Sequence, residues 1–244
     1  MKLLVDIGNT RIKWAVEVNG VVEKSSAINH QSQYLEQIQQ KWSVIESPEI
    51  LAISSVSNQG IVNQLLILAK KLWPNVSFVI AKSTTQGFDI TNGYKQANKL
   101  GVDRWMGLIA LRHYYPGDSC IIDCGTAITI DVLNKQGLHL GGLISPGLQL
   151  MKQSLFQGTE NLSYVKQAFS LGLSDATDSA IFSGTSLAAV GLIDKVITEF
   201  AKECQTIVLT GGDAVLLSKY LDYQVFIEQD FILKGLALYA KGSV

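Results

Sequence analysis

The sequence predicts an α/β protein built from two related halves. Its 244 residues exceed the roughly 100 to 150 residues of a typical single domain. Hydrophobic residues make up 47% of the chain and charged residues only 17%, which is enough apolar material for buried cores. Runs with strand and helix periodicity alternate along the chain, and one hairpin-like segment occurs twice.

The first half begins with a hairpin. Residues 2–18 read as a strand, a polar turn containing Gly8 and a second strand with apolar alternation, closed by the hairpin dipeptide Asn19-Gly20. The patterns that follow predict, in order, a helix at 31–42, a strand at 50–56, a helix at 60–73, a strand at 76–81 and a helix from Asp103 to Tyr115.

The hairpin is repeated in the second half. Residues 5–20 can be laid without gaps on residues 122–137, which places Asp6 on Asp123, Gly8 on Gly125 and Gly20 on Gly137. The later patterns predict strands at 138–145, 206–209 and 223–227 and helices at 148–155, 181–202, 214–221 and 231–241. The turn cluster Tyr115-Pro116-Gly117-Asp118 marks the expected boundary, which gives domains at 1–115 and 116–244.

Charge and hydropathy exclude several classes of function. A net charge of -1 and the absence of any Lys/Arg-rich run argue against nucleic acid as a partner. Asp6 interrupts the first apolar stretch, so we expect no signal peptide, and no later run resembles a membrane span. The sequence contains neither a P-loop nor the glycine pattern of a dinucleotide fold.

Cysteine and histidine usage points to the cytoplasm and away from a metal centre. Cys120 and Cys124 lie four apart in an expected strand, about 13 Å at about 3.3 Å per residue, too far to bridge. With Cys204 we expect them to be small buried hydrophobes in a reducing compartment. We expect His30, His113 and His139 to be ordinary surface or partly buried residues.

The two Asp-x-Gly turns are candidate phosphate sites. A glycine in such a turn lets backbone N–H groups approach an anion, and an aspartate at the strand end offers a hard oxygen ligand for the accompanying cation. Asn9, Thr10 and Lys13 add donors beside the first turn. The alternative is an aspartate that only caps its own turn.

Two further segments allow two interpretations each. Asp103, next to Arg104, is either a helix N-cap or a general base, with the guanidinium binding a carboxylate or phosphate. The glycines of Thr210-Gly211-Gly212-Asp213 follow a strand and suit either a nucleotide's base and ribose or a plain turn. The apolar face of residues 181–200 is either core or a dimer contact.

Taken together, five motifs resemble those of the type III pantothenate kinases in order and spacing, over nearly the whole chain. They are Asp6-Ile7-Gly8-Asn9-Thr10, Gly101-Val102-Asp103-Arg104, Asp123-Cys124-Gly125-Thr126-Ala127 with Thr129 and Asp131, Gly141-Gly142-x-Ile144-x-Pro146-Gly147, and Thr210-Gly211-Gly212-Asp213-Ala214. The family commonly has a proline where this chain has Ala97, so we expect a less rigid loop around Tyr94.

The resemblance implies the fold of acetate and sugar kinases, Hsp70 and actin: two duplicated ribonuclease H-like domains with ATP in the cleft between them. It implies a cytoplasmic homodimer that phosphorylates pantothenate with ATP, Mg²⁺ and a monovalent cation, K⁺ or NH₄⁺, as the first step of coenzyme A biosynthesis. The pantothenate site would lie near the subunit interface.

The resemblance also assigns roles residue by residue. Asp103 would accept the proton of the attacking hydroxyl, Asp123 would coordinate the monovalent cation, and Asp6 would hold Mg²⁺ through water. The residues implied to bind ATP are Asp6, Ile7, Gly8, Asn9, Thr10, Arg11, Ile12, Lys13 and Thr126, and those implied to bind pantothenate are Tyr94, Gly101, Val102, Asp103, Arg104 and Thr177.

Two other classes remain open from the sequence. A phosphohydrolase of the same superfamily would use the Asp-Gly turns to position water, and the pair Asp103-Arg104 favours a transferase instead. A non-catalytic regulator is the second class, because some relatives were first regarded as accessory transcription factors. Such a protein would bind nucleotide without turnover. The absence of a basic run argues against DNA contact.

Overall fold

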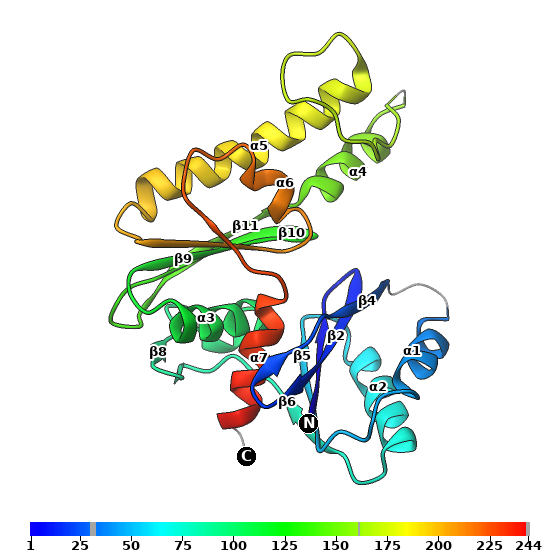
Figure 1. Ribbon diagram of the computed structural model, residues 1–244. Coiled ribbons are helices and arrows are strands. Elements are labelled where there is room, and N and C mark those ends of the chain that lie inside the picture. Colours follow the sequence, from blue (N-terminus) through cyan, green and yellow to red (C-terminus); the bar gives the residue numbers. More distant parts are fainter. Residues whose placement is uncertain (30–32, 161, 243–244) are drawn as a thin grey trace. The chain divides into compact units, whose positions relative to one another are not determined.

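The computed structural model describes residues 1–29, 33–160 and 162–242, and its contacts divide the chain into two compact units (Figure 1). Unit 1 comprises Met1–Tyr115 and the segment that begins at Asp230, and unit 2 comprises Pro116–Gln229. The division expected from sequence placed the closing helix in the second domain. Its contacts instead group it with unit 1, because its apolar face packs on the first sheet.

Unit 1 is built on a mixed sheet in the order β3-β2-β1-β5-β6, with β4 also paired to β2. The pair β1–β2 is antiparallel, and β5 and β6 continue the sheet in parallel. The strands are β1 (Lys2–Ile7), β2 (Arg11–Val18), β3 (Val21–Val22), β4 (Ser26–Asn29), β5 (Ile50–Ser55) and β6 (Ser77–Ile80). Its remaining elements are α1 (Tyr34–Trp42), α2 (Gln59–Leu72), β7 (Gln86–Gly87), β8 (Ile90–Thr91), the 3₁₀ turn η1 (Ala97–Lys99), α3 (Val102–Tyr114) and α7 (Phe231–Gly242).

Helices cover this sheet because its central strands are apolar on both sides. Leu3, Val5 and Ile7 of β1 belong to the core beneath α1 and α2. The intervening Leu4 is also fully buried, and α7 packs against β1 and β5. Helix α1 begins later than the expected residue 31, since Gln33 has the left-handed φ of 72°; residues 30–32 lie outside the described part of the chain.

The helices α3 and α7 approach each other closely at Gly235. A Cβ atom at this position would lie 2.7 Å from the carbonyl carbon of Met106 in α3. Only glycine permits this backbone approach. Because the buried part of α3 follows directly on Asp103, the α3–α7 contact fixes the start of α3 on the sheet of unit 1.

Unit 2 repeats the architecture with the sheet order β11-β10-β9-β12-β13. Its strands are β9 (Ser119–Cys124), β10 (Ala127–Leu133), β11 (His139–Pro146), β12 (Thr206–Thr210) and β13 (Phe226–Ile227), and its helices are α4 (Leu148–Gly158), α5 (Thr177–Phe200) and α6 (Ala214–Ser218). Helix α5 begins a turn earlier than residue 181, because Thr177 and Asp178 open it with polar side chains that apolar periodicity does not detect.

The duplication inferred from sequence is visible in the strand order. Each unit contains an antiparallel hairpin, β1–β2 in unit 1 and β9–β10 in unit 2. Two parallel strands then extend the sheet from the first strand of the hairpin, β5 and β6 in unit 1 and β12 and β13 in unit 2. However, the ungapped alignment of residues 5–20 with residues 122–137 does not match equivalent strand positions after the turn. Asp6 lies opposite Lys13, whereas Asp123 lies opposite Thr129 and not Ile130, since the second turn is one residue shorter.

Helix α5 is long and apolar. Of the helices in the described residues, it is the one whose length and mean hydropathy of 1.5 would suffice to span a membrane. Within that stretch 56% of the residues are buried inside the protein, and Ala189, Ile193 and Val196 belong to the unit 2 core. Its apolar character is therefore that of a core helix.

Candidate functional site

The first Asp-x-Gly turn is open to solvent. The N–H of Gly8 donates to the carbonyl oxygen of Arg11 at 3.0 Å, which closes the turn and leaves Asn9 and Thr10 exposed. Asp6 and Lys13 are cross-strand partners, so their side chains lie on the same face of the sheet. The side chains of Ile7 and Ile12 are fully buried, which leaves only their backbone groups for a ligand.

Lys13 is held by a carboxylate from the far end of the sequence. Its Nζ lies 2.6 Å from Oδ1 of Asp230, the residue before α7, and the Ser25 hydroxyl donates to the same oxygen at 2.7 Å. Burial raises the pKa of Asp230, but the hydrogen bonds from Lys13 and Ser25 outweigh it and leave the pKa below its usual value. The sequence motifs gave no signal for this partner, because Asp230 belongs to no recognised pattern.

The second Asp-x-Gly turn is enclosed by later parts of unit 2. The N–H of Gly125 donates to the Ala127 carbonyl at 3.1 Å, and the N–H of Gly147 donates to the Thr126 carbonyl at 2.9 Å. A Cβ atom on Gly147 would lie 2.7 Å from that carbonyl oxygen, and one on Gly211 would lie 2.6 Å from the Cys124 carbonyl. Both glycines are therefore needed for the backbone to close around this turn.

The surroundings of Asp123 suit a cation that prefers oxygen ligands. A Cβ atom on Gly125 would lie 3.3 Å from Oδ1 of Asp123, and a side chain on Gly211 would overlap the same oxygen, so the two glycines leave room beside the carboxylate. No group of three or more His, Cys, Asp or Glu side chains gathers within the described residues. A cation there would thus take further ligands from backbone carbonyls, water or substrate.

Asp103 lies in the first turn of α3. The sequence interpretation of Asp103 as the N-cap is wrong: Gly101 is the N-cap, and helix α3 already begins at Val102. Oδ1 of Asp103 accepts a hydrogen bond from the N–H of Arg104 at 2.7 Å. The positive end of the helix favours a carboxylate here, and a side chain at Gly101 would lie 2.5 Å from that oxygen.

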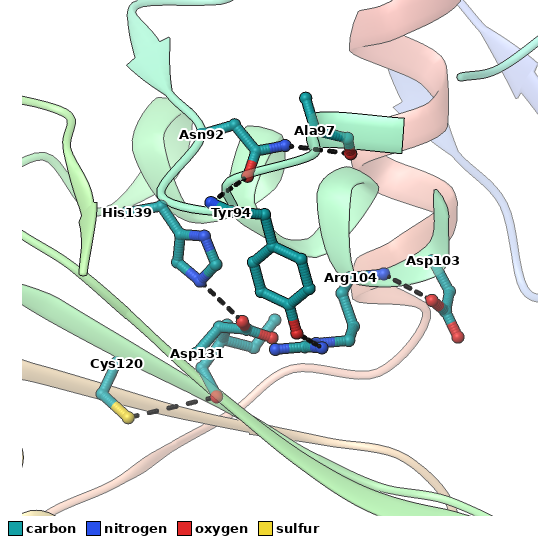
Figure 2. A network of polar contacts seen from close by, with 9 residues as sticks. Asn92, Tyr94, Ala97, Asp103, Arg104, Cys120, Asp131 and His139 are labelled. Carbon is teal, nitrogen blue, oxygen red and sulfur yellow. Dashed lines mark hydrogen bonds and ion pairs between the residues drawn. The ribbon is translucent and has the colours of Figure 1, made fainter. Parts of the chain in front are cut away.

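The buried Arg104 pairs with the half-buried Tyr94 beside Asp103 (Figure 2). Nη1 of Arg104 donates to the Tyr94 hydroxyl at 2.7 Å, and the guanidinium carbon lies 5.4 Å from the centre of the tyrosine ring. Arg104 is only 6% exposed. Hydrogen bonding and stacking thus fix its orientation, as anion recognition by a guanidinium requires.

The loop that carries Tyr94 is anchored by a residue that sequence reasoning missed. Asn92 is 7% exposed, accepts a hydrogen bond from the Tyr94 N–H at 3.0 Å, and donates to the carbonyls of Thr84 at 3.1 Å and Ala97 at 3.3 Å (Figure 2). These bonds restrain the loop around Tyr94 and Ala97, which the sequence predicted to be less rigid.

The implied substrate residues divide between the units. Tyr94, Gly101, Val102, Asp103 and Arg104 come together within unit 1, at and before the start of α3. Thr177 belongs to unit 2, where it is the exposed first residue of α5.

His139 differs from the sequence expectation. It is 1% exposed rather than at the surface, and its Nε2 lies 2.8 Å from Oδ1 of the buried Asp131 (Figure 2). The two residues meet because β10 and β11 pair across the sheet, a relation that linear spacing did not reveal. His113 is exposed, as expected, and His30 lies outside the described residues.

The surroundings of the cysteines disfavour the thiolate form. Cys120 and Cys124 are fully buried in the unit 2 core, as expected for small hydrophobes. Burial raises the pKa of both thiols, and that of the half-buried Cys204 to about 11. The described structure therefore offers no thiolate nucleophile at neutral pH.

Comparison with protein families matches residues 2–199 to the model described as type III pantothenate kinase. A type III pantothenate kinase from Nitrosococcus oceani is 36% identical over 254 residues, covering 100% of this chain and 95% of the relative. One from Laribacter hongkongensis is 33% identical, and the match covers 100% of both chains.

Solved structures with the same fold are more distant in sequence. A Campylobacter jejuni protein assigned to the Baf family of transcriptional activators superposes with a TM-score of 0.64 at 22% identity, over 99% of this chain and 100% of its own. The archaeal actin homologue Ta0583 superposes with a TM-score of 0.52 at 9% identity, over 99% of each chain. These two likenesses concern the fold alone, which is the actin-like and sugar kinase-like fold.

Proposed function

The chain belongs to the type III pantothenate kinase family, and from this premise we propose how its residues share the ATP-dependent phosphorylation of pantothenate. The primary hydroxyl of pantothenate attacks the γ-phosphorus of ATP, giving 4'-phosphopantothenate and ADP. Phosphoryl transfer of this kind depends mainly on alignment of the reactants and neutralisation of charge. Each proposed role follows from the surroundings of one group.

Asp103 is the proposed acceptor of the hydroxyl proton. The hydrogen bond from the Arg104 N–H to Oδ1 fixes the carboxylate in the first turn of α3, and the buried residues that follow anchor the helix. A general base must be held in this way to meet the hydroxyl in one orientation. This fixed carboxylate beside an oriented arginine is the observation that carries the assignment.

Arg104 and Tyr94 are the proposed anchors for pantothenate, together with Gly101, Val102 and Thr177. Pantothenate carries a carboxylate, and the buried, stacked guanidinium of Arg104 offers a charge-assisted partner of fixed direction. Consecutive side chains on a helix diverge by about 100°, so Arg104 and Asp103 can reach the two ends of a small acid, its carboxylate and its hydroxyl.

ATP phosphates are proposed to bind at residues 6–13 and at Thr126. The exposed Asn9 and Thr10 supply donors at the first turn, and Lys13 supplies a positive charge. The residues fit the cations that the family implies: Asp6 would hold Mg²⁺ through water, and Asp123 would hold K⁺ or NH₄⁺ in the space left by its two glycines. Bound there, these cations would balance phosphate charge.

A homodimer in the cytoplasm is the proposed state of the enzyme, with no nucleic acid or membrane as partner. Edge strand β11 carries Leu140, Leu143 and Ile144 at 57%, 43% and 66% exposure. Leu140 and Leu143, with Phe200 of α5, border an apolar hollow of about 450 Å³. Apolar surface on an edge strand is commonly covered by another chain, which supports the dimer.

The substitution Asp103→Asn tests the central assignment. Asparagine retains an oxygen for the Arg104 N–H but cannot accept the proton, so we expect kcat to fall by about 10²-fold or more while ADP affinity changes little. Phosphopantothenate and ADP should be measured together, with Asp89→Asn on the exposed surface as the control. Near-normal turnover would refute the role, and ADP without phosphopantothenate would identify a hydrolase.

A further inference from the structure

Unit 2 contains a buried lysine that no recognised motif includes. Lys152, in α4, is 8% exposed, and its Nζ lies 4.9 Å from the centre of the Phe182 ring. Within the described part of the chain it makes no ion pair or hydrogen bond. A buried ammonium without a partner is unfavourable, and the ring offsets only part of that loss.

Charge and burial act on Lys152 in opposite directions. Burial lowers the pKa of its ammonium, and attraction by Asp213 opposes that shift. Asp213 lies beyond ion-pair distance, so a single carboxylate acts from a distance on a largely desolvated cation. An anion that reached this ammonium would relieve its desolvation, which is the behaviour of a binding residue rather than of a structural ion pair.

The position of Lys152 in unit 2 suggests which anion this is. Helix α4 starts directly on the second Asp-x-Gly turn through the Gly147–Thr126 hydrogen bond, and Lys152 follows Gly147 by five residues, about 7.5 Å along a helix axis. On its other side Asp213 ends the glycine turn after β12, and the Asp213 N–H donates to the Cys124 carbonyl at 3.0 Å. Lys152 thus lies near both the phosphate-type turn and the turn suited to a nucleoside.

We propose that Lys152 binds the diphosphate of the adenine nucleotide, the part that ATP and ADP share. The inference rests on the proposed function, because it assumes that the two turns of unit 2 face a nucleotide. Lys13, beside the first turn, is paired with Asp230 and 38% exposed. Lys152 instead is a cation whose partner arrives with the ligand.

The substitution Lys152→Met tests this, because methionine retains the apolar stem and its packing on Phe182 but has no charge. We expect the Kd for ADP to rise about tenfold or more, with the Kd for adenosine unchanged, both followed by NMR chemical shifts. The nucleotide-free variant should melt no lower than wild type. Lys195→Met in α5, which removes an exposed lysine paired with Glu199, is the matched control and should bind ADP as wild type does.

Two results would overturn the proposal: an unchanged Kd for ADP, or an equal loss for adenosine and ADP, which would reveal a packing role. If Lys152→Met does not fold, a measurement on the wild-type protein tests the proposal instead. The NMR titration of its Lys152 ammonium should show a pKa that ADP raises and adenosine does not; no rise with ADP contradicts the proposal. Wild-type turnover measured on the same preparation separates this failure from a failure of the kinase assignment.

Discussion

The two Asp-x-Gly turns share a local sequence but have opposite surroundings. At the first, Asn9 and Thr10 are exposed, and the nearest charged neighbour of Asp6 across the strands is Lys13. At the second, the backbones of Gly147 and Gly211 pack closely against the turn that contains Asp123 and Thr126. One turn is open with exposed donors, and the other is closed around a carboxylate.

The turn motif alone therefore does not determine the chemistry of the site that it forms. Each hairpin forms from its own residues, but what surrounds it comes from distant parts of the chain: Asp230 at the first turn, and Gly147 and Gly211 at the second. Duplication supplied the same turn twice, and later segments made the two turns different.

The largest contrast is expected from alanine at the flanking glycines. Gly211 has a φ of +90°, and its Cβ would lie 2.6 Å from the Cys124 carbonyl, so Gly211→Ala should lower the free energy of unfolding by about 3 kcal/mol. At Gly8 the nearest atom would be the Arg11 oxygen at 3.6 Å, so Gly8→Ala should cost less than about 1 kcal/mol. Urea titration measures both, and equal losses would abolish the distinction between a closed and an open turn.

The second largest difference is expected between substitutions of Asp123 and of Asp6, in their dependence on cations. If Asp123 holds the monovalent cation, Asp123→Asn should remove most of the stimulation by K⁺ or NH₄⁺ over Na⁺ and reduce kcat/KM by about tenfold or more. Asp6→Asn should retain the stimulation and instead raise the KM for MgATP. Initial rates in potassium and sodium buffers test this. Identical cation profiles in the two variants would mean that the turns do not divide the cations.

The smallest effect concerns Asp230, whose pKa lies below its usual value. A carboxylate with a lowered folded-state pKa adds stability above its unfolded pKa, and this is lost as the pH falls through the folded value. Lys13 is 38% exposed, so solvent screens the pair, and we expect a contribution of about 1 kcal/mol. Urea midpoints at pH 6 and pH 3 should therefore differ less in Asp230→Asn than in wild type.

Asp89→Asn is the control for that comparison, because Asp89 is exposed and asparagine tolerates its φ of 57°. If Asp230→Asn retains the full wild-type loss of stability at low pH, the pair with Lys13 does not stabilise the first turn.

The sequence predicted the parts of the fold that depend on neighbouring residues. The hairpins, the central strands and most helices follow from apolar periodicity and from dipeptides such as Asn19-Gly20, which adopts positive φ at both positions. The short strands β3, β4, β7 and β8 escaped, because two to four residues carry too little pattern.

The contacts in the site that the sequence did not predict are those that no local residue pattern indicates. Asp230 meets Lys13 through tertiary placement, His139 pairs with Asp131 across two strands, and Asn92 anchors the Tyr94 loop through bonds within an irregular segment that has no periodic pattern. The apolar face of α7 predicted that the helix is buried but not which sheet it covers. Of the two interpretations of Asp103, the N-cap is wrong because the helix starts at Val102, with a glycine before it where a capping side chain is usual.

The return of α7 to unit 1 bears on how the chain is made. Residues 116–229 of unit 2 are contiguous in the sequence, so all of unit 2 leaves the ribosome before the last segment does. Unit 1 begins translation first but lacks the helix that packs on Met106 until Phe231–Gly242 has also left the ribosome. We therefore expect the later-synthesised unit to mature first, reversing the usual order of cotranslational folding.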